Sequence, residues 1–301
     1  MLDWPTVSII VTCYNESACI EKCLDSIIAF DYPGHLLEII VVDGMSDDET
    51  RELIKKFCQF YGYIQMIDNP RRLKPAGNNL GIMSASHEYV LIMDGHTAYP
   101  PDYIEKVIAG SIATGSDNYG GIIEVVPRNN TLTGQTLAAV NTSPFAVGNA
   151  YYRIGTDQVR KVDTVPFGCF KRELFNRIGL FNPDLPRAED RDLNARIISA
   201  GGSIYLDPSI QCRYFIRSNL KEYLKWIKQN GLWVFYASRF TDTSFRSWRN
   251  YIPLLFLLYC LALLPLYLAA PPALLFTMLF PLGLYLFLDI LFSARIAIHN
   301  R

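Results

Sequence analysis

The feature that most limits the possible folds of this chain is an alternation of short apolar runs with polar, helix-like segments over residues 1–215. Helix-like stretches separate the runs near 17–29, 47–61 and 77–86. This alternation predicts an α/β fold with a mostly parallel central sheet and helices on both faces. The runs are short and β-branched and end in polar residues, as buried strands do: VSIIVTCYN (7–15), LEIIVVDG (37–44), YIQMID (63–68) and EYVLIMDG (88–95).

The C-terminal part of the chain has a different composition. Residues 219–240 mix large apolar side chains with Lys and Arg, which is typical of an amphipathic helix at a membrane surface, although an ordinary packing helix is the alternative. Two apolar runs follow, Ile252 to Ala270 and Ala273 to Phe292, each long enough to span a bilayer. We therefore expect an α/β domain at 1–215, an interfacial segment at 216–245, two transmembrane helices at 250–294 and a cytoplasmic tail at 295–301.

Charge and cysteine usage indicate the compartment. Arg246 and Arg249 precede the apolar runs and Arg295 and Arg301 follow them, so the positive-inside rule places both ends in the cytoplasm. The N-terminus does not resemble a signal peptide, and seven cysteines without a CxxC pair indicate reduced thiols. We expect an integral protein of the cell (inner) membrane with a cytoplasmic catalytic domain; a re-entrant or surface-lying helix pair is the alternative. The net charge of −1 argues against a nucleic-acid partner.

Four groups of polar residues follow predicted strands or open a predicted helix. A single acidic residue after a strand is more often a turn or helix cap than a ligand. Together, however, the groups place several carboxylates and a histidine at one edge of a sheet, where ligands of such sheets bind and where like charges are costly unless a cation or catalysis requires them. The groups are Thr12 to Glu16, Asp43 to Asp48, Asp94-Gly95-His96, and Glu189 to Leu193.

In this order, VSIIVTCYNE, IIVVDGMSDDET, AGNNLGI, YVLIMDGH and AEDRDL resemble the family 2 inverting glycosyltransferases with the GT-A fold. The resemblance covers nearly all of residues 5–215. DGHTAYPPDYI, VPFGCF and the C-terminal apolar part are similar to the succinoglycan-type exopolysaccharide glucosyltransferases. The resemblance implies a Rossmann-like GT-A domain that binds a nucleotide-sugar donor.

The resemblance also implies which residues bind the donor. Asp43 would accept a hydrogen bond from the nucleobase, which favours a UDP-sugar because uracil offers an N3–H. Thr12, Asn15 and Glu16 would line the same pocket. Of the basic pair Arg71 and Lys74, one would contact the diphosphate, although a solvated basic loop is an equal alternative; Asn78 belongs to the matching segment that follows.

A departing diphosphate needs its charge neutralised, and a divalent cation does this in many transferases. Family members usually hold it with an Asp-x-Asp motif, whereas this chain has Asp94-Gly95-His96. The resemblance implies that Asp94 contacts the ribose or the metal and that His96 takes the second metal position. Imidazole suits Mn²⁺ better than Mg²⁺, so we expect Mn²⁺ or Mg²⁺ as cofactor; a turn histidine without a ligand is the alternative for His96.

The resemblance implies that Asp190 is the catalytic base, because it matches the Asp of the family's Glu-Asp pair; an inverting transfer needs a carboxylate to take the proton of the acceptor hydroxyl. Asp192 competes for this role, Glu189 would orient the acceptor, and capping of the following helix is the structural alternative. Gln229 and Trp233 share a helix face and resemble the acceptor-stacking Q-x-x-x-W segment of processive synthases, although an interfacial tryptophan anchor is favoured.

We therefore hypothesise transfer of one hexose, glucose from UDP-glucose, onto a lipid-linked saccharide at the membrane, with inversion to a β linkage. The apolar hairpin motivates the lipid-linked acceptor, because a shared membrane raises the encounter rate. Three alternatives stay open: a processive polysaccharide synthase, a nucleotidyltransferase on a similar fold, and a catalytically inactive membrane scaffold.

Overall fold

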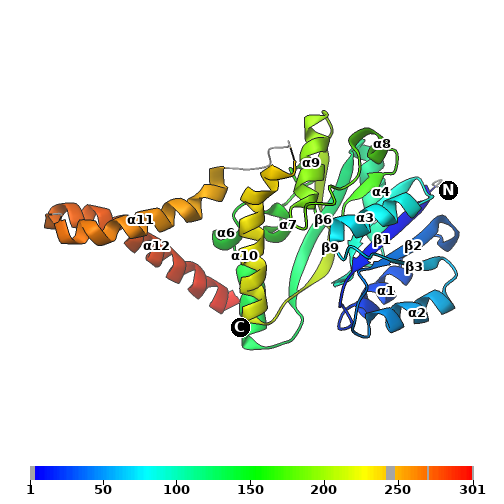
Figure 1. Ribbon diagram of the computed structural model, residues 1–301, viewed down its shortest axis with the longest axis horizontal. Coiled ribbons are helices and arrows are strands. Elements are labelled where there is room, and N and C mark those ends of the chain that lie inside the picture. Colours follow the sequence, from blue (N-terminus) through cyan, green and yellow to red (C-terminus); the bar gives the residue numbers. More distant parts are fainter. Residues whose placement is uncertain (1–3, 242–247, 270, 300–301) are drawn as a thin grey trace.

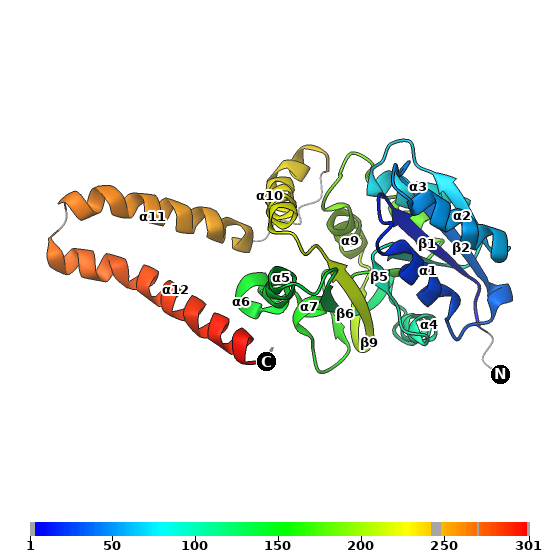
Figure 2. The same ribbon diagram turned by 90° about the horizontal axis from the view of Figure 1, so that it is seen from below.

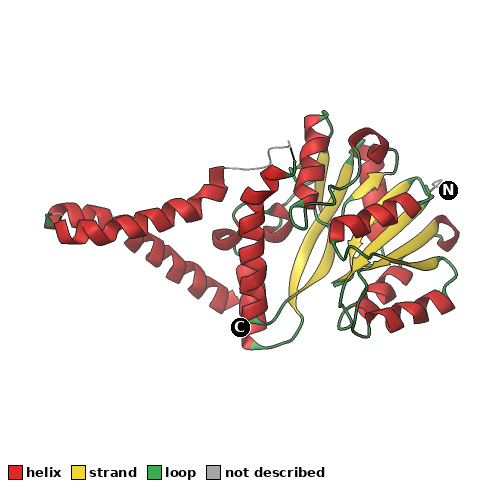
Figure 3. Cartoon of the chain, viewed as in Figure 1, coloured by secondary structure: helices red, strands yellow, loops and turns green. Residues whose placement is uncertain are grey.

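The computed structural model describes residues 4–241, 248–269 and 271–299. Figure 1 and Figure 3 show an α/β domain that carries one curved sheet, with two long helices extending away from it. The predicted alternation is confirmed over the first four strands. These are β1 (Val7–Cys13), β2 (Leu37–Asp43), β3 (Ile64–Asp68) and β4 (Tyr89–Asp94), with helices α1 (Ile20–Ile28), α2 (Thr50–Phe60) and α3 (Lys74–Ser84) between them.

The second half of the domain adds further strands to the same sheet, of which β6 and β9 are the longest. Its strands are β5 (Thr97–Ala98), β6 (Asn118–Pro127), β7 (Arg160–Lys161), β8 (Cys169–Lys171) and β9 (Ile204–Ile216). Its helices are α4 (Tyr103–Thr114), α5 (Leu132–Thr142), α6 (Pro144–Val147), α7 (Tyr151–Ile154), α8 (Leu174–Ile178) and α9 (Glu189–Ser199). Among the described residues, 3₁₀ turns lie at Gly34–Leu36, Ala237–Arg239 and Trp248–Tyr251.

The strand order is β3-β2-β1-β4-β8-β6-β9-β5, and β7 pairs with β9. The four N-terminal strands are parallel, so their carboxyl ends lie at one edge. β8 runs antiparallel between β4 and β6, and β6 is again parallel to β9. The expectation of a mostly parallel central sheet is met, with β8 as the strand that reverses direction inside it.

Every residue of β1 is buried, because helices cover both faces of the sheet. Side chains alternate between the faces with a period of two. Ile9 and Val11 therefore enter the core cluster that contains α1 and α4, whereas Ile10 enters the one with α3, α8 and α9. Figure 2 shows α3 and α4 on opposite sides of the sheet. This double layer holds the strand ends, and the loops that follow them, in fixed positions.

The C-terminal part forms α10 (Leu220–Tyr236), α11 (Ile252–Ala269) and α12 (Pro272–His299). In both views α11 and α12 extend side by side away from the sheet domain (Figures 1 and 2). α12 returns to the domain at Phe145 of α6, whose ring stacks on Phe292 with centroids 5.1 Å apart. Most large apolar side chains described on α11 and α12 are exposed.

By length and composition, one helical stretch among the described residues could cross a membrane: Phe276–Ile298 within α12. The apolar stretch described in α11, Ile252–Leu263, is shorter. The predicted pair of spanning helices, and the segment boundaries around them, therefore stay predictions. α10 agrees with the expected amphipathic helix: it exposes Leu220, Leu224, Ile227, Leu232 and Phe235 and buries Tyr223.

Candidate functional site

The loops after the parallel strands adopt backbone conformations that most residues avoid. Non-glycine residues with left-handed φ among the described residues are Asn15, Met45, Arg72, Phe167 and Ala188. Asn15 follows β1, Met45 follows β2, and Ala188 directly precedes α9. Such conformations persist only where surrounding contacts over-determine them, and they cluster at ligand sites. Their positions identify the carboxyl edge of the sheet as the candidate site.

The loop after β1 and the loop after β2 interlock through Asn15. Its Nδ2 donates to Asp47 Oδ1 at 2.6 Å, and its Oδ1 accepts from the Asp47 backbone N–H at 3.0 Å. The Asn15 backbone N–H donates to Ser46 Oγ at 2.9 Å. Asn15 therefore ties the two loops predicted to bind the nucleotide into one unit.

Asp43, at the end of β2, holds the second of these loops through buried hydrogen bonds. Its side chain is fully buried and accepts hydrogen bonds from Ser46 Oγ at 2.5 Å and from the Ser46 backbone N–H at 3.0 Å. Arg51 Nη1 lies 2.5 Å from the same carboxylate and Arg51 Nη2 lies 2.8 Å from Asp68. A direct contact between Asp43 and a nucleobase stays a prediction that requires Ser46 or Arg51 to release the carboxylate.

Glu16 and His96 form a second charged group at this edge. Glu16 Oε1 lies 3.2 Å from His96 Nδ1, and Glu16 Oε2 accepts from Arg128 at 2.6 Å. The His96 ring also packs edge-on against Tyr214, with centroids 5.0 Å apart. Burial lowers the pKa of His96, but Tyr214, Glu16 and Asp94 outweigh burial and raise it to about 9. This arrangement therefore favours the protonated ring of His96.

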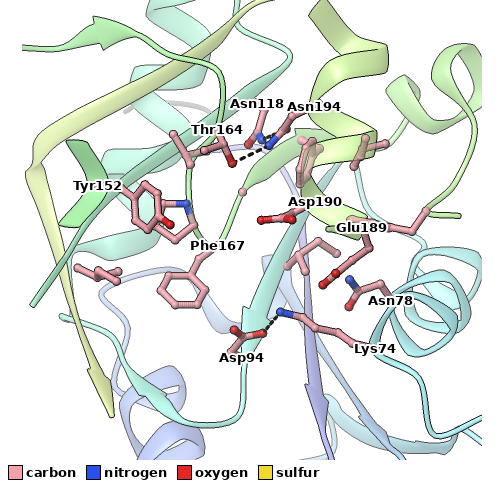
Figure 4. A pocket seen from close by; sticks show the side chains of 18 of the residues that line it. Lys74, Asn78, Asp94, Asn118, Tyr152, Thr164, Phe167, Glu189, Asp190 and Asn194 are labelled. Atoms are coloured by element: carbon pink, nitrogen blue, oxygen red, sulfur yellow. Dashed lines mark hydrogen bonds and ion pairs between the residues drawn. The ribbon is translucent and has the colours of Figure 1, made fainter. Parts of the chain in front are cut away.

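A cavity of about 180 Å³ lies beside these loops, between α9, α3 and the segment before β8. Lys74 at the start of α3 and Asp94 at the end of β4 pair across it, with Nζ and Oδ1 2.5 Å apart. Glu189 and Asp190, at the start of α9, also line it. Figure 4 shows Asp190 between the Lys74–Asp94 pair and a group of neutral polar side chains.

The charges in this cavity perturb one another. Burial raises the pKa of Glu189, and the charge on Asp190 adds to this, so that the pKa reaches about 7 despite the opposing effect of Lys74. Burial also raises the pKa of Asp94, but Lys74 and His96 outweigh it and the pKa falls below its ordinary value. The cavity thus holds an ionised Asp94 and a Glu189 that can carry a proton near neutral pH.

The first turn of α9 separates its three acidic residues into different environments. Asp190 is exposed and faces the cavity, and its Oδ1 accepts from the Arg191 backbone N–H at 2.8 Å. Asp192 is 1% exposed, does not line the cavity, and pairs with Arg196 at 2.9 Å. Of the two candidates for the base, Asp190 is therefore the one with access to a substrate.

The same geometry tests whether the residues fit a divalent cation. Among the residues the structure describes, no group of three or more His, Cys, Asp or Glu side chains is arranged to hold a metal ion. Cations that bind nucleotide phosphates, however, commonly use one or two carboxylates and take their other ligands from the phosphates and water. Asp94 fits that role, because its carboxylate lines the cavity. The role predicted for His96 stays a prediction: its Nδ1 faces Glu16, and its other ring nitrogen would have to be deprotonated to bind a metal.

Of the remaining predicted residues, only Asn78 lines the cavity. Thr12 is nearly buried and packs against Gly77 of α3, and Arg71 points to Asp184, where both side chains are exposed. Gln229 accepts from Arg187 at 3.1 Å, and Trp233 packs on Phe240. Asn78 lines the cavity together with Lys74, so of the basic pair in this loop it is Lys74 that reaches the site.

Several residues at the site did not stand out in the sequence. Arg128, the partner of Glu16, follows β6 and is 112 positions away in the chain. Asn118, Thr164 and Asn194 line the cavity from β6, from the segment before β8, and from α9. Asn194 could have been found from the sequence, because it follows Asp190 by four residues and such residues share a helix face.

Comparison with known proteins identifies the family. The family model described as "Glycosyl transferase family 2" matches residues 8–179, more than half of the chain. A "Dolichyl N-acetyl-alpha-D-glucosaminyl phosphate 3-beta-D-2,3-diacetamido-2,3-dideoxy-beta-D-glucuronosyltransferase" of Methanococcus voltae is 26% identical over 73% of this chain and 70% of its own length. The "Succinoglycan biosynthesis protein ExoA" of Rhizobium meliloti is 26% identical over 70% of this chain; the chain spans 64% of that relative.

Solved structures resemble the chain as a whole. The mannosyltransferase PcManGT from Pyrobaculum calidifontis, in complex with GDP-Man and Mn²⁺, has a TM-score of 0.64 at 22% identity and covers 99% of this chain and 88% of its own. S. aureus TarS 1–349, in complex with UDP-GlcNAc, has a TM-score of 0.55 at 16% identity, over 81% of this chain and 69% of its own. At these identities the likeness shows the fold alone, and it confirms the predicted GT-A fold.

Proposed function

The chain belongs to glycosyl transferase family 2, and on that premise we propose that it moves a hexose from a UDP-sugar to a lipid-linked saccharide, with inversion at the anomeric carbon. Glucose is the expected hexose, as in the succinoglycan-type resemblance. The observation that carries the proposal is the position of Asp190. Its exposed carboxylate faces a cavity whose opposite wall holds the Lys74–Asp94 pair, which supports Asp190 as the proposed base and Lys74 as the proposed contact of the diphosphate.

Such an arrangement suits a single displacement. The acceptor hydroxyl attacks the anomeric carbon, Asp190 takes the hydroxyl proton, the new C–O bond forms, and the bond to the diphosphate oxygen breaks. Lys74 stands where the negative charge of the leaving diphosphate develops, once the donor separates it from Asp94. Glu189, protonated near neutral pH, can donate a hydrogen bond to an acceptor or donor oxygen.

A divalent cation is part of the proposal, with Mn²⁺ and Mg²⁺ as candidates; the solved relative PcManGT contains Mn²⁺. Asp94 would hold it together with the donor phosphates. The cation would supply neutralisation of the diphosphate charge. If Asp94 alone holds the cation, His96 and Arg128 stay paired with Glu16, next to the predicted nucleotide loops.

The lipid-linked acceptor and the membrane location rest on two observations. The large apolar side chains that α10, α11 and α12 expose are those expected of a chain that works at a bilayer. The archaeal relative is named for a dolichyl phosphate saccharide. We infer that the acceptor reaches Asp190 from a membrane surface, with the catalytic domain on the cytoplasmic side.

Replacement of Asp190 by Asn tests the proposal most directly. Asn keeps the shape but accepts no proton, so transfer should fall by about 100-fold or more, because a positioned base commonly contributes that much. Binding of free UDP, measured by calorimetry, should stay within about twofold. Asp25→Asn on α1, an exposed position, serves as the matched control.

Near wild-type turnover in the Asp190→Asn variant would remove Asp190 as the base. The assay should pair each nucleotide sugar with a lipid-linked acceptor in vesicles and resolve the product by length. One added sugar supports the proposal, whereas a ladder of products would favour the processive alternative, to which Gln229 and Trp233 gave slight support. Release of pyrophosphate would instead indicate a nucleotidyltransferase.

A further inference from the structure

The end of the cavity opposite the Lys74–Asp94 pair is built from three neutral polar side chains (Figure 4). Asn118 Nδ2 donates to Asn194 Oδ1 at 2.9 Å, and Asn194 Nδ2 donates to Thr164 Oγ1 at 3.0 Å. Asn118 and Asn194 are 1% and 2% exposed. These bonds hold the three side chains in one orientation, and they belong to three different segments of the chain.

This group leaves two hydrogen-bonding functions unused. Asn118 Oδ1 is buried and has no partner among the described residues, although its residue lines the cavity. Thr164 Oγ1 accepts from Asn194, which leaves its own O–H to donate. A buried polar atom without a partner is costly and rare in native proteins. A free acceptor and a free donor on adjacent side chains therefore suggest that a ligand group completes the network.

The surrounding backbone keeps room for this group. A Cβ at Gly168 would lie 2.4 Å from Asn118 Oδ1, so a larger residue there would displace the amide. The neighbouring Phe167 holds a left-handed backbone with φ of 51° and lines the same cavity. Strain of this kind persists where the surrounding structure enforces it, which is expected for a loop that shapes a binding site.

We propose that Asn118, Thr164 and Asn194 form a subsite that recognises a neutral, hydrogen-bonding substituent of the transferred sugar, a hydroxyl or an acetamido group. Such a substituent donates to Asn118 Oδ1 and accepts from the Thr164 hydroxyl. The inference rests on the proposed function and names the sugar class that the same site selects. Asn194 lies one helical turn after Asp190, so a sugar seated here has its reacting carbon beside the base.

The same chemistry selects against a carboxylate at this position. None of the three side chains is a cation, and the free oxygen of Asn118 would repel a negative charge. Lys74 is at the other end of the cavity, paired with Asp94. Arg153 is a cation that also lines the cavity; its guanidinium donates to Asn141 at 3.2 Å and to Tyr152 at 3.3 Å, and it bonds none of the three side chains among the bonds described. The chain should therefore prefer a neutral sugar over a uronic acid.

The test compares how strongly the protein binds and uses nucleotide sugars when the Thr164 hydroxyl is removed. The probes are UDP-glucose, UDP-N-acetylglucosamine, UDP-glucuronic acid and GDP-mannose, each measured against free UDP or GDP by calorimetry and by kcat/KM. Thr164→Val keeps the side-chain shape, and Thr164→Ser restores a hydroxyl. Thr114→Val is the control, because that exposed threonine bonds only the Gly110 carbonyl on α4 among the bonds described.

The wild-type protein should favour a neutral sugar over UDP-glucuronic acid. Thr164→Val should lose about 10- to 100-fold in kcat/KM for that sugar and lose the affinity that the sugar adds to the nucleotide, which is the loss expected for one unpaired buried group. The affinity of Thr164→Val for the free nucleotide should stay within about twofold of wild type, and its discrimination against UDP-glucuronic acid should shrink. Thr164→Ser should recover most of the lost kcat/KM and most of the lost sugar affinity. Asn118→Leu should reproduce the loss.

Three results would overturn the inference. They are unchanged use of every sugar by Thr164→Val, an equal loss for neutral and acidic sugars, and loss of free-nucleotide binding, which would make Thr164 structural. Failure of the proposed function has a different signature. A wild-type protein that binds a neutral sugar more tightly than its nucleotide, through Thr164, but never transfers it would keep the subsite and refute the transferase reaction.

Discussion

Replacement of Glu189 by Gln should stabilise the protein at alkaline pH. Burial and the neighbouring Asp190 raise the pKa of Glu189 from 4.5 to about 7, so the folded state resists its ionisation. Between these values the folded chain binds more protons than the unfolded one, and stability falls as the pH rises. Integrating this linkage gives a penalty of about 1 kcal/mol at pH 5 and at most about 3 kcal/mol at pH 8. Gln cannot ionise and removes the penalty.

The assay is chemical or thermal unfolding of both proteins at pH 5 and pH 8. The Glu189→Gln variant should gain roughly 5 °C in Tm over the wild type at pH 8 and much less at pH 5. Comparing the variant with the wild type cancels the titration of all other groups. Glu52→Gln, an exposed position on α2, should show no such dependence. An equal difference at both pH values, or a variant that is less stable at pH 8, would refute the reasoning.

Three further predictions follow from single contacts. Asp43→Asn should cost about 2 kcal/mol in chemical denaturation, because Arg51 loses a fully buried partner but keeps Asp68; a cost below about 0.5 kcal/mol would contradict this. Gly110→Ala should cost about 1–3 kcal/mol, because its Cβ would lie 2.2 Å from the Tyr119 ring, whereas Gly231→Ala, with no atom nearby, should cost nothing. Asp94→Asn should abolish the response of donor turnover to added Mn²⁺, and an unchanged metal response would exclude Asp94 as the ligand.

The first strands and the polar residues that follow them were predictable, because a strand buried on both faces has a short, continuous run of apolar residues in its sequence. β1, β2 and β4 are short, β-branched and almost entirely buried, and polar residues begin where each strand ends. The sequence pattern predicts the start of α3 near residue 77, but the helix begins at Lys74, with Pro75 in its first turn, a position that proline favours. Reading that proline as a helix start would have placed Lys74 correctly.

The partners of the predicted residues were less accessible to sequence reasoning. Glu16 was assigned to the site because it follows β1, but its pairing with Arg128 depends on the packing of β6 against the rest of the sheet. Asp43 and Asp192 show the same limit, since each looks like a free carboxylate in sequence and is buried against an arginine in the structure. A motif identifies carboxylates, but only tertiary contacts decide which of them meets a substrate.

The backbone conformations of the loops at the site could not be predicted from the local sequence. Sequence rules assign left-handed backbone to glycine and asparagine, and of the five such non-glycine residues described, only Asn15 follows them. Met45, Phe167 and Ala188 have no local reason to adopt it. Each is, or adjoins, a residue that meets a distant part of the chain: Ser46 Oγ accepts from the Asn15 backbone N–H, the Phe167 carbonyl accepts from Tyr103, and Glu189 lines the cavity. The long-range contacts that hold these loops outweigh the strain, so the site is a property of the folded sheet edge and not of any one motif.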